Sequence, residues 1–223
     1  MGLFTKKIIK KNLAYYIGEI IVIVLGIFIA IQLNNWNDIR KAKQQEKKVI
    51  KHLLTDLDKE KFVLKNSINS LNKNEQFLKK IIYNSNTKNL DSIQIHMSSS
   101  FAHFPLNAVY INLKTSGQLD IISNDKIRHD IVNYYEVYYK VYQAMEDDHK
   151  MFIKEKVSEY FDNEFPSDTT WLVNPDLVKL KLKDKKFQKL IIDQIASCKM
   201  IKDYINISSV DNLIATIKKE TTN

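Results

Sequence analysis

The chain has 223 residues, which is enough for about one ordinary domain and an anchor. Four glycines, three prolines and an apolar fraction of 44% argue against a disordered chain and against a turn-rich sheet protein. The formal net charge is +8, but lysines alternate with acids along the whole chain, which is typical of a solvated surface. The single cysteine, Cys198, excludes an internal disulfide and is expected to be a buried helix residue.

An apolar stretch follows a basic tail at residues 1–12. Residues 13–36 read LAYYIGEIIVIVLGIFIAIQLNNW, and the about 21 residues from Leu13 to Leu33 can cross a hydrocarbon core of about 30 Å as a helix. Tyr15 and Tyr16 at one end and Trp36 at the other suit the two membrane interfaces. A cleavable signal peptide is the competing interpretation. The length of the stretch and the lack of a small-residue cleavage site favour an uncleaved signal anchor.

Small residues and one acid interrupt this span. Ala14, Gly18, Gly26 and Ala30 fall on a four-residue repeat that would let two helices approach closely in lipid. Glu19 is costly inside a membrane unless it reaches the headgroups or hydrogen-bonds across a helix interface. Both interpretations of Glu19 stay open, and glycine and alanine are also common in membrane helices. We expect the span to associate with a second copy through these five residues.

Residues 37–85 show a heptad pattern. The apolar residues that recur in three- and four-residue steps are Ile50, Leu54, Leu57, Leu64, Ile68, Leu71, Leu78 and Ile82, interrupted by Lys61 and Glu75. The pattern predicts a long helix that continues from the membrane span. It fits an intermolecular coiled-coil stalk and the first helix of an intramolecular bundle equally well.

Residues 86–223 are predicted to form a helical body. A polar turn and a looser segment ending at Pro105 come first, followed by a short helix from Asn107 to Gly117. A long helix begins at Asn124 or Asp125, continues to about Phe161, and places Ile127, Ile131, Tyr134, Tyr138, Val141 and Met145 on one face. Asn174-Pro175 begins the last helical region, where LVKLKLK could instead be a short strand. The predicted fold is all-α: a transmembrane helix, a long stalk helix and an antiparallel helical bundle.

The residues that could carry chemistry give weak patterns. Tyr134, Tyr138 and Tyr142 recur along one helix face, either as bundle core or as a partner or ligand surface. His149 beside Asp147-Asp148, and His129 beside Asp130, could ligate a metal, but adjacent residues on a helix point to different faces. We interpret these histidines and acids as surface charges. The sequence predicts no catalytic residue, no metal site and no cofactor.

Two blocks of residues resemble a known family. The stretch YxIGEIIxxVxGIxIAxQxNNWN after a basic tail, and the later block Tyr110, Leu113, Ser116-Gly117, Leu119, Ile122, Asn124, Arg128 and Tyr134-Tyr135, are similar to a bacterial membrane-protein family described only as a domain of unknown function. The resemblance implies a single span near the amino terminus and a helical body, and it implies no activity, cofactor or catalytic residue.

The resulting functional hypothesis is a single-pass, non-enzymatic scaffold or receptor-like protein. We expect it in a bacterial inner membrane, with the amino terminus cytoplasmic and the body extracytoplasmic. The expected partners are membrane lipid, further copies of the chain, and a membrane or envelope protein, with nucleic acid disfavoured. One alternative is a cytoplasmic basic body that binds anionic lipid or nucleic acid. The other is a metal-dependent hydrolase that uses the His149 region.

Overall fold

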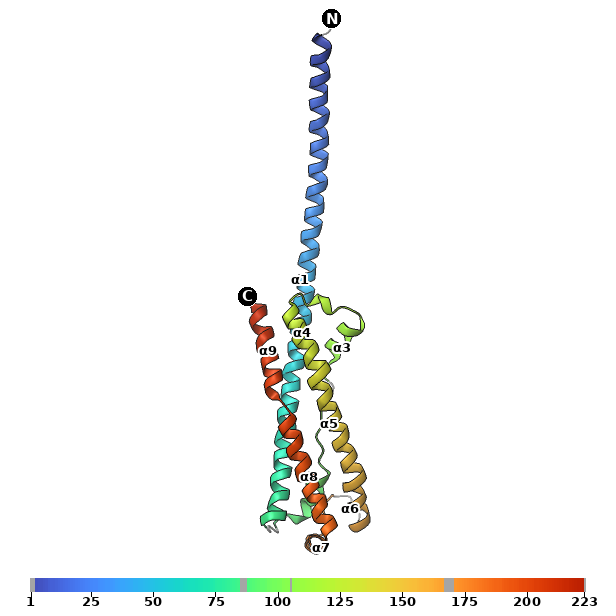
Figure 1. The fold of residues 1–223 in the computed structure, drawn as a ribbon, viewed down its shortest axis with the longest axis vertical. Helices are drawn as coiled ribbons and strands as arrows, with labels where there is room; N and C mark the ends of the chain where they lie inside the picture. Colours follow the sequence, from blue (N-terminus) through green and yellow to red (C-terminus); the bar gives the residue numbers. More distant parts are fainter. Residues whose placement is uncertain (1–2, 85–87, 105, 167–170, 223) are drawn as a thin grey trace. The chain divides into compact units, whose positions relative to one another are not determined.

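The computed structural model describes residues 3–84, 88–104, 106–166 and 171–222, and the side chains of residues 17–83, 88–104, 106–166 and 171–220. Every regular element in this part of the chain is helical, as Figure 1 shows, and the predicted all-α class is confirmed. The chain divides into two compact units, Met1–Val49 and Ile50–Asn223. Each unit is described by itself below.

The first unit consists of helix α1, which runs over Leu3–Asn84 and continues into the second unit. The side chains of residues 17–45 are exposed in this helix. An 18-residue window of α1 has a mean hydropathy of 2.3 and is not buried by any other part of the protein. By length and composition α1 can therefore cross a membrane.

The second unit is built around three long helical runs. They are α1 from Ile50 onward; the continuous run α4 (Asp125–Asn133), η3 (Tyr134–Tyr138), α5 (Tyr139–Phe152), η4 (Ile153–Ser158) and α6 (Glu159–Glu164); and the pair α8 (Lys185–Tyr204) and α9 (Ile207–Thr222). The shorter elements between them are η1 (Leu90–Ser92), α2 (Ile93–Ser98), α3 (Ala108–Thr115), η2 (Leu119–Ile121) and α7 (Pro175–Lys181).

An extended segment, residues 99–104, returns the chain between the first two runs, and we call it the strap. From α2 through the strap, the hydrogen-bond partners on α1 lie at progressively lower residue numbers. His96 of α2 bonds to Asn74, the carbonyl of Ala102 to Ser67, and His103 to Glu60. Extended backbone rises about 3.3 Å per residue against 1.5 Å in a helix, so few residues cover several helical turns. The strap therefore lets α1 and α4–α6 run in the same direction, with α8–α9 opposite to both (Figure 1).

Among the described residues, a large and a smaller apolar cluster help to hold the runs together. The larger one joins α1, η1, α2, η4, α6, α7 and α8 through residues such as Leu78, Ile93, Val157, Phe161, Val178, Phe187 and Ile191. The other joins Leu64 and Leu71 of α1 to Phe101 of the strap, Tyr142 of α5, and Cys198, Ile201 and Ile205. Cys198 is fully buried, which confirms its predicted place in the interior of a helix.

Two of the predicted capping residues, Asn124 and Asn174, cap helices with their side chains, whereas Asn107 precedes α3 without a capping hydrogen bond from its side chain. The side chain of Asn124 accepts hydrogen bonds from the backbone nitrogens of Lys126 and Ile127, and Asn174 does the same at the start of α7. Gly117 follows α3 with a φ of 68°, the left-handed conformation that glycine adopts without strain. The alternative of a strand at LVKLKLK is wrong, because the Asn174 cap and Pro175 begin helix α7 there.

The buried face of α1 differs from the predicted heptad in one of its two rows. Ile50, Leu57, Leu64, Leu71 and Leu78 are buried as predicted. Leu54, Lys61, Ile68 and Ile82 are only half-buried, while Glu75 is buried and pairs with Lys79 and Lys202. The second buried row instead consists of Leu53, Glu60, Asn74 and Ile81, with the half-buried Ser67 between Glu60 and Asn74. Three polar residues thus occupy positions where a bundle helix usually presents apolar ones. Their partners lie on the strap and on α2.

A π-helical segment changes the buried face of the second run. Ile127, Ile131 and Tyr134 are buried as predicted, but after them the buried residues are Tyr135, Tyr139 and Tyr142. The wider turn of η3 delays the helical phase by about one residue. Val141, predicted to be on the buried face, is therefore exposed, and Tyr138 is only half-buried.

The register of α1 can be tested with two adjacent leucines. Leu53 is fully buried and Leu54 is half-buried. We expect Leu53→Ala to lower the free energy of unfolding by about 2–5 kcal/mol, the usual cost of truncating a buried leucine. Leu54→Ala is the matched control and should cost clearly less. The measurement is urea unfolding of the full chain in detergent, followed by near-ultraviolet circular dichroism. A larger loss for Leu54→Ala would contradict the observed register.

Candidate functional site

The strap buries Phe101 and His103 in the second unit, and no backbone–backbone hydrogen bond joins residues 99–104 to another described element. Side chains supply the missing hydrogen bonds instead. The Ser67 hydroxyl donates to the carbonyl oxygen of Ala102 at 2.8 Å. Next to the strap, His96 Nδ1 lies 2.9 Å from Asn74 Oδ1. The polar residues on this face of α1 therefore serve as hydrogen-bond partners for the strap and for α2.

Two further helices complete this arrangement. The backbone nitrogen of Phe101 donates to Nδ1 of His149 in α5 at 2.9 Å, and Nε2 of His149 lies 3.0 Å from Oε1 of Gln194 in α8. Nε2 of Gln194 donates to the carbonyl oxygens of Met97 at 3.1 Å and Ser99 at 3.3 Å. One histidine and one glutamine thus close a circuit of hydrogen bonds around residues 97–101.

This circuit fixes the proton on His149. Nδ1 accepts from a backbone N–H, so the neutral ring must carry its proton on Nε2, where it donates to Gln194. Burial lowers the pKa of His149, although the hydrogen bond with Gln194 acts in the opposite direction. A second proton on the ring would place a donor against the N–H of Phe101. The strap is therefore held by the neutral form of His149.

A buried pair of ionisable side chains lies at the other end of the strap. Nε2 of His103 hydrogen-bonds to Oε1 of Glu60, and both side chains are buried. The His103 ring packs edge-on against Tyr139 and Tyr142, with ring centroids 4.5 Å and 5.6 Å away. Buried polar atoms without a hydrogen-bond partner among the described residues gather here: Glu60 Oε2, His103 Nδ1, Tyr135 OH and Tyr139 OH.

Tyr134 connects this buried pair to the surface. Its hydroxyl donates to Glu60 Oε1 at 3.5 Å, and its side chain lines a hollow of about 210 Å³ between the α4–η3 run and α9. Burial, with a smaller contribution from Glu60, raises the pKa of Tyr134 well above its usual range, so the phenol stays protonated as a donor. The hollow and the buried pair therefore share one side chain.

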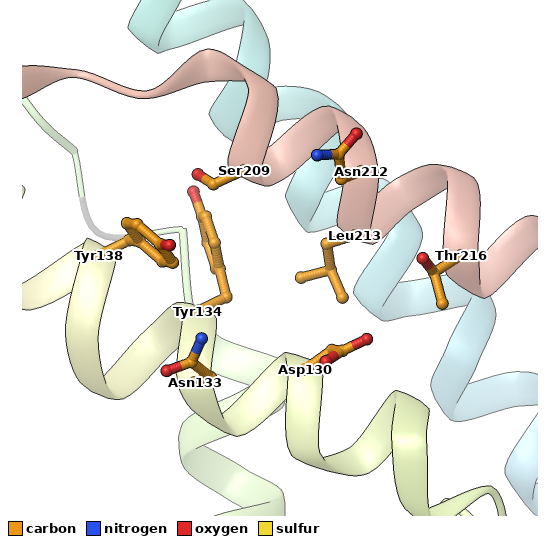
Figure 2. A pocket seen from close by; sticks show the side chains of 8 residues that line it. All are labelled: Asp130, Asn133, Tyr134, Tyr138, Ser209, Asn212, Leu213 and Thr216. Carbon is orange, nitrogen blue, oxygen red and sulfur yellow. The ribbon is translucent and has the colours of Figure 1, made fainter.

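The two walls of the hollow come from two helical faces (Figure 2). Asp130, Asn133, Tyr134 and Tyr138 line the first wall. Ser209, Asn212, Leu213 and Thr216 line the wall from α9. Figure 2 shows the Tyr134 ring and Leu213 directed into the space between the helices. Seven of these eight side chains carry a polar group, so the hollow offers hydrogen bonds more than apolar surface.

The three tyrosines singled out from the sequence have different environments. Tyr134 and Tyr142 are buried, while Tyr138 is half-buried. Tyr134 and Tyr138 line the hollow. The Tyr142 hydroxyl donates to the carbonyl oxygen of Asn206 at 3.4 Å, between α8 and α9. Two of the three therefore face a common space.

The residues predicted to assemble the span lie on the exposed part of α1. Gly18, Glu19, Gly26 and Ala30 are exposed, and so is Trp36 at the predicted interface. A methyl group added at Gly18 or Gly26 would lie in open space among the described residues, apart from the neighbouring backbone of α1. The side chains of Ala14, Tyr15 and Tyr16 fall outside the described residues.

The interpretation of His149 as a surface charge is wrong, because its side chain is buried and bonded to the strap. Its neighbours Asp147 and Asp148 are exposed, and His129 is exposed. Among the described residues, no three His, Cys, Asp or Glu side chains form a group that could hold a metal ion. Sequence reasoning missed Glu60, His103 and Gln194. The one available signal was the seven-residue spacing of Glu60, Ser67 and Asn74.

The Glu60–His103 pair can be tested by a double-mutant cycle. Removing one member leaves the other buried without its partner, which costs about 3–5 kcal/mol. We expect Glu60→Leu and His103→Phe each to destabilise the body strongly, and the double variant to lose clearly less than the sum. The control cycle pairs Glu60→Leu with His129→Phe at an exposed histidine, where the losses should add. Additive losses in both cycles would contradict a direct interaction between Glu60 and His103.

Because the folded protein holds His149 in its neutral form, we expect the free energy of unfolding to depend on pH. Its pKa is lower in the folded protein than the value near 6.5 in the unfolded chain, so the unfolded state binds the proton first as the pH falls. The contribution of neutral His149 to the free energy of unfolding is present in full above about pH 6.5. Below that pH it declines, by at most about 1.4 kcal/mol per pH unit. His149→Asn should flatten the decline between about pH 7 and 5.5 in urea unfolding, while His129→Asn should not. Equal slopes in the wild type and His149→Asn would contradict this role.

Comparison with known proteins gives one match. No curated protein and no solved structure matches the chain. A family model described as "Family of unknown function (DUF6090)" matches residues 19–217, which include most of the membrane-compatible stretch and nearly all of the helical body. The chain therefore belongs to this family of unknown function.

Proposed function

We propose that this protein is a single-pass, non-enzymatic membrane protein that self-associates through its span and presents its helical body to a partner or ligand. It resides in a bacterial inner membrane as an uncleaved signal anchor, with the amino terminus in the cytoplasm and the body outside. The hollow between α4–η3 and α9 is the place on the body where a ligand binds.

The exposed apolar surface of α1 carries this proposal. From Ile17 to Leu33 every side chain is exposed, and all but a few of them are aliphatic or aromatic. Contiguous apolar patches on soluble monomers rarely exceed a few hundred Å². A hydrocarbon environment covers such a helix on all sides, which favours a membrane span over a helix that docks by one face.

The body supports a binding role more than a catalytic one. The ionisable side chains of Glu60 and His103 are buried and bonded to each other. The hollow, in contrast, is open at Asn133 and Asn212, which are exposed. A small site that is open to solvent and connected to a buried hydrogen-bond network is suited to detecting a ligand.

The lysines of the body do not favour an anionic polymer as the partner. Carboxylates pair with lysines on several different elements: Lys61, Lys79, Lys114, Lys140, Lys150, Lys179, Lys181, Lys189 and Lys202. A nucleic-acid-binding surface instead gathers unpaired cations on one face. The paired lysines are therefore dispersed over several elements and do not form one unpaired cationic face.

Self-association of the span can be tested at Gly26. A Cβ added there would have open space around it, apart from the neighbouring backbone of its own helix, so the effect of a larger side chain reports on a second helix. We expect Gly26→Ile to reduce the co-purification of two differently tagged full-length copies from membranes, because the added side chain blocks close helix approach. Phe28→Ile places the same residue about 200° around the helix and should leave co-purification unchanged. Equal recovery from both variants would refute the small-residue interface.

A further inference from the structure

The hollow differs from an ordinary seam between two bundle helices. Its first wall has the spacing i, i+3, i+4, i+8 from Asp130 to Tyr138, and its second wall has i, i+3, i+4, i+7 from Ser209 to Thr216. Residues at these spacings form one face of a helix and normally interdigitate as apolar side chains. Here the two faces are polar and leave a space of about 210 Å³ between them.

The polar groups of the two walls do not satisfy each other. In the part of the chain that the structure describes, no hydrogen bond joins Asp130 or Asn133 to Asn212 or Thr216 across the hollow. Around the strap, by contrast, His149 and Gln194 are bonded to each other, and Gln194 is also bonded to the backbone. The walls thus present a carboxylate, two amides and a hydroxyl to whatever enters the space.

We propose that the hollow binds a single small, uncharged polyhydroxyl ring, the size of a monosaccharide. This inference specifies the ligand in the function proposed above and rests on that function. The volume of about 210 Å³ lies below the roughly 300–1,000 Å³ of pockets for drug-sized ligands, so an oligosaccharide would not be enclosed.

The donors and acceptors of the walls select hydroxyl groups. Asn133 and Asn212 each offer an amide NH₂ donor and a carbonyl acceptor, and Asp130 offers acceptors only. A hydroxyl donates and accepts, so it can pair with all three residues. A cationic nitrogen, whether an ammonium or a tetramethylammonium group, offers no acceptor and would leave both amide NH₂ groups unpaired. An anion such as phosphate would meet the Asp130 carboxylate and no cation in the lining.

The apolar part of the lining fits the remaining surface of a sugar ring. Leu213 and the rings of Tyr134 and Tyr138 lie between the polar groups of the two walls (Figure 2). The CH groups of a pyranose can pack on such surfaces while its hydroxyls reach the amides. A bound ring would contact Tyr134, whose hydroxyl donates to Glu60 at 3.5 Å. Ligand binding would therefore be communicated to the Glu60–His103 pair and the strap.

The test is saturation-transfer-difference NMR and calorimetric titration of the full chain in lipid nanodiscs. The probes are glucose, N-acetylglucosamine and myo-inositol, with tetramethylammonium and inorganic phosphate as the charged comparators. We expect saturable binding of at least one polyhydroxyl probe and none of the charged ones. Asp130→Asn and Thr216→Val should each weaken that binding about tenfold or more. The first replaces an acceptor oxygen by a donor and removes the charge that strengthens its hydrogen bonds, and the second removes a hydroxyl, each with little change in shape.

The matched control is Asp148→Asn, which makes the same chemical change at an exposed site on α5 outside the hollow and should leave affinity unchanged. Absence of saturable binding by all three polyhydroxyl probes overturns the inference, and so does binding that Asp130→Asn and Thr216→Val do not weaken. Preferential binding of tetramethylammonium or phosphate overturns the ligand class. The same nanodisc samples report on self-association, so a chain that assembles but binds no polyhydroxyl compound refutes this inference and leaves the proposed anchor and assembly standing.

Discussion

A non-helical segment inside a helical bundle must find partners for its backbone, and the second unit is organised around that requirement. The strap has no neighbouring strand, so each buried carbonyl or amide would cost free energy if it were left unpaired. Ser67 of α1, His149 of α5 and Gln194 of α8 meet this demand from three different helices. The same contacts fix the position of the three long runs along their axes, because Ser67, His149 and Gln194 must each lie next to the strap atom that they bond.

The π-helical turn at Tyr134–Tyr138 also shapes the interior around the strap. It moves Tyr135, Tyr139 and Tyr142 inward, where aromatic rings surround the His103 imidazole at one end of the strap. It also leaves Tyr134 with its ring at the hollow and its hydroxyl at Glu60. Wide turns of this kind cost regular hydrogen bonding and are frequent at functional positions. Here the turn places one side chain in both the hollow and the buried network.

Much of this architecture could be predicted from the sequence, since the long helices and their caps rest on local signals. Leu57, Leu64, Leu71 and Leu78 recur every seven residues, and Asn124 and Asn174 precede helices that they cap. The second row of α1 could not be assigned in this way. Hydrophobic patterning does not favour Glu60 and Asn74 on a buried face, and their partners, His103 of the strap and His96 of α2, lie 43 and 22 residues away. His149 was misassigned for the same reason, because its partners Phe101 and Gln194 lie 48 and 45 residues away.

The sequence separations within this interior bear on how the protein is made. Gln194 bonds to Met97 across 97 residues, and Lys202 reaches Asn72 across 130 residues. Contacts of such long range slow folding, because the chain loses much entropy before they form. A ribosome must therefore synthesise α8 before the strap can be enclosed, while the hydrophobic span emerges early. Until then the leucines of α1 and the backbone of the strap remain open to misassembly, and this body would benefit from a chaperone that holds it during synthesis.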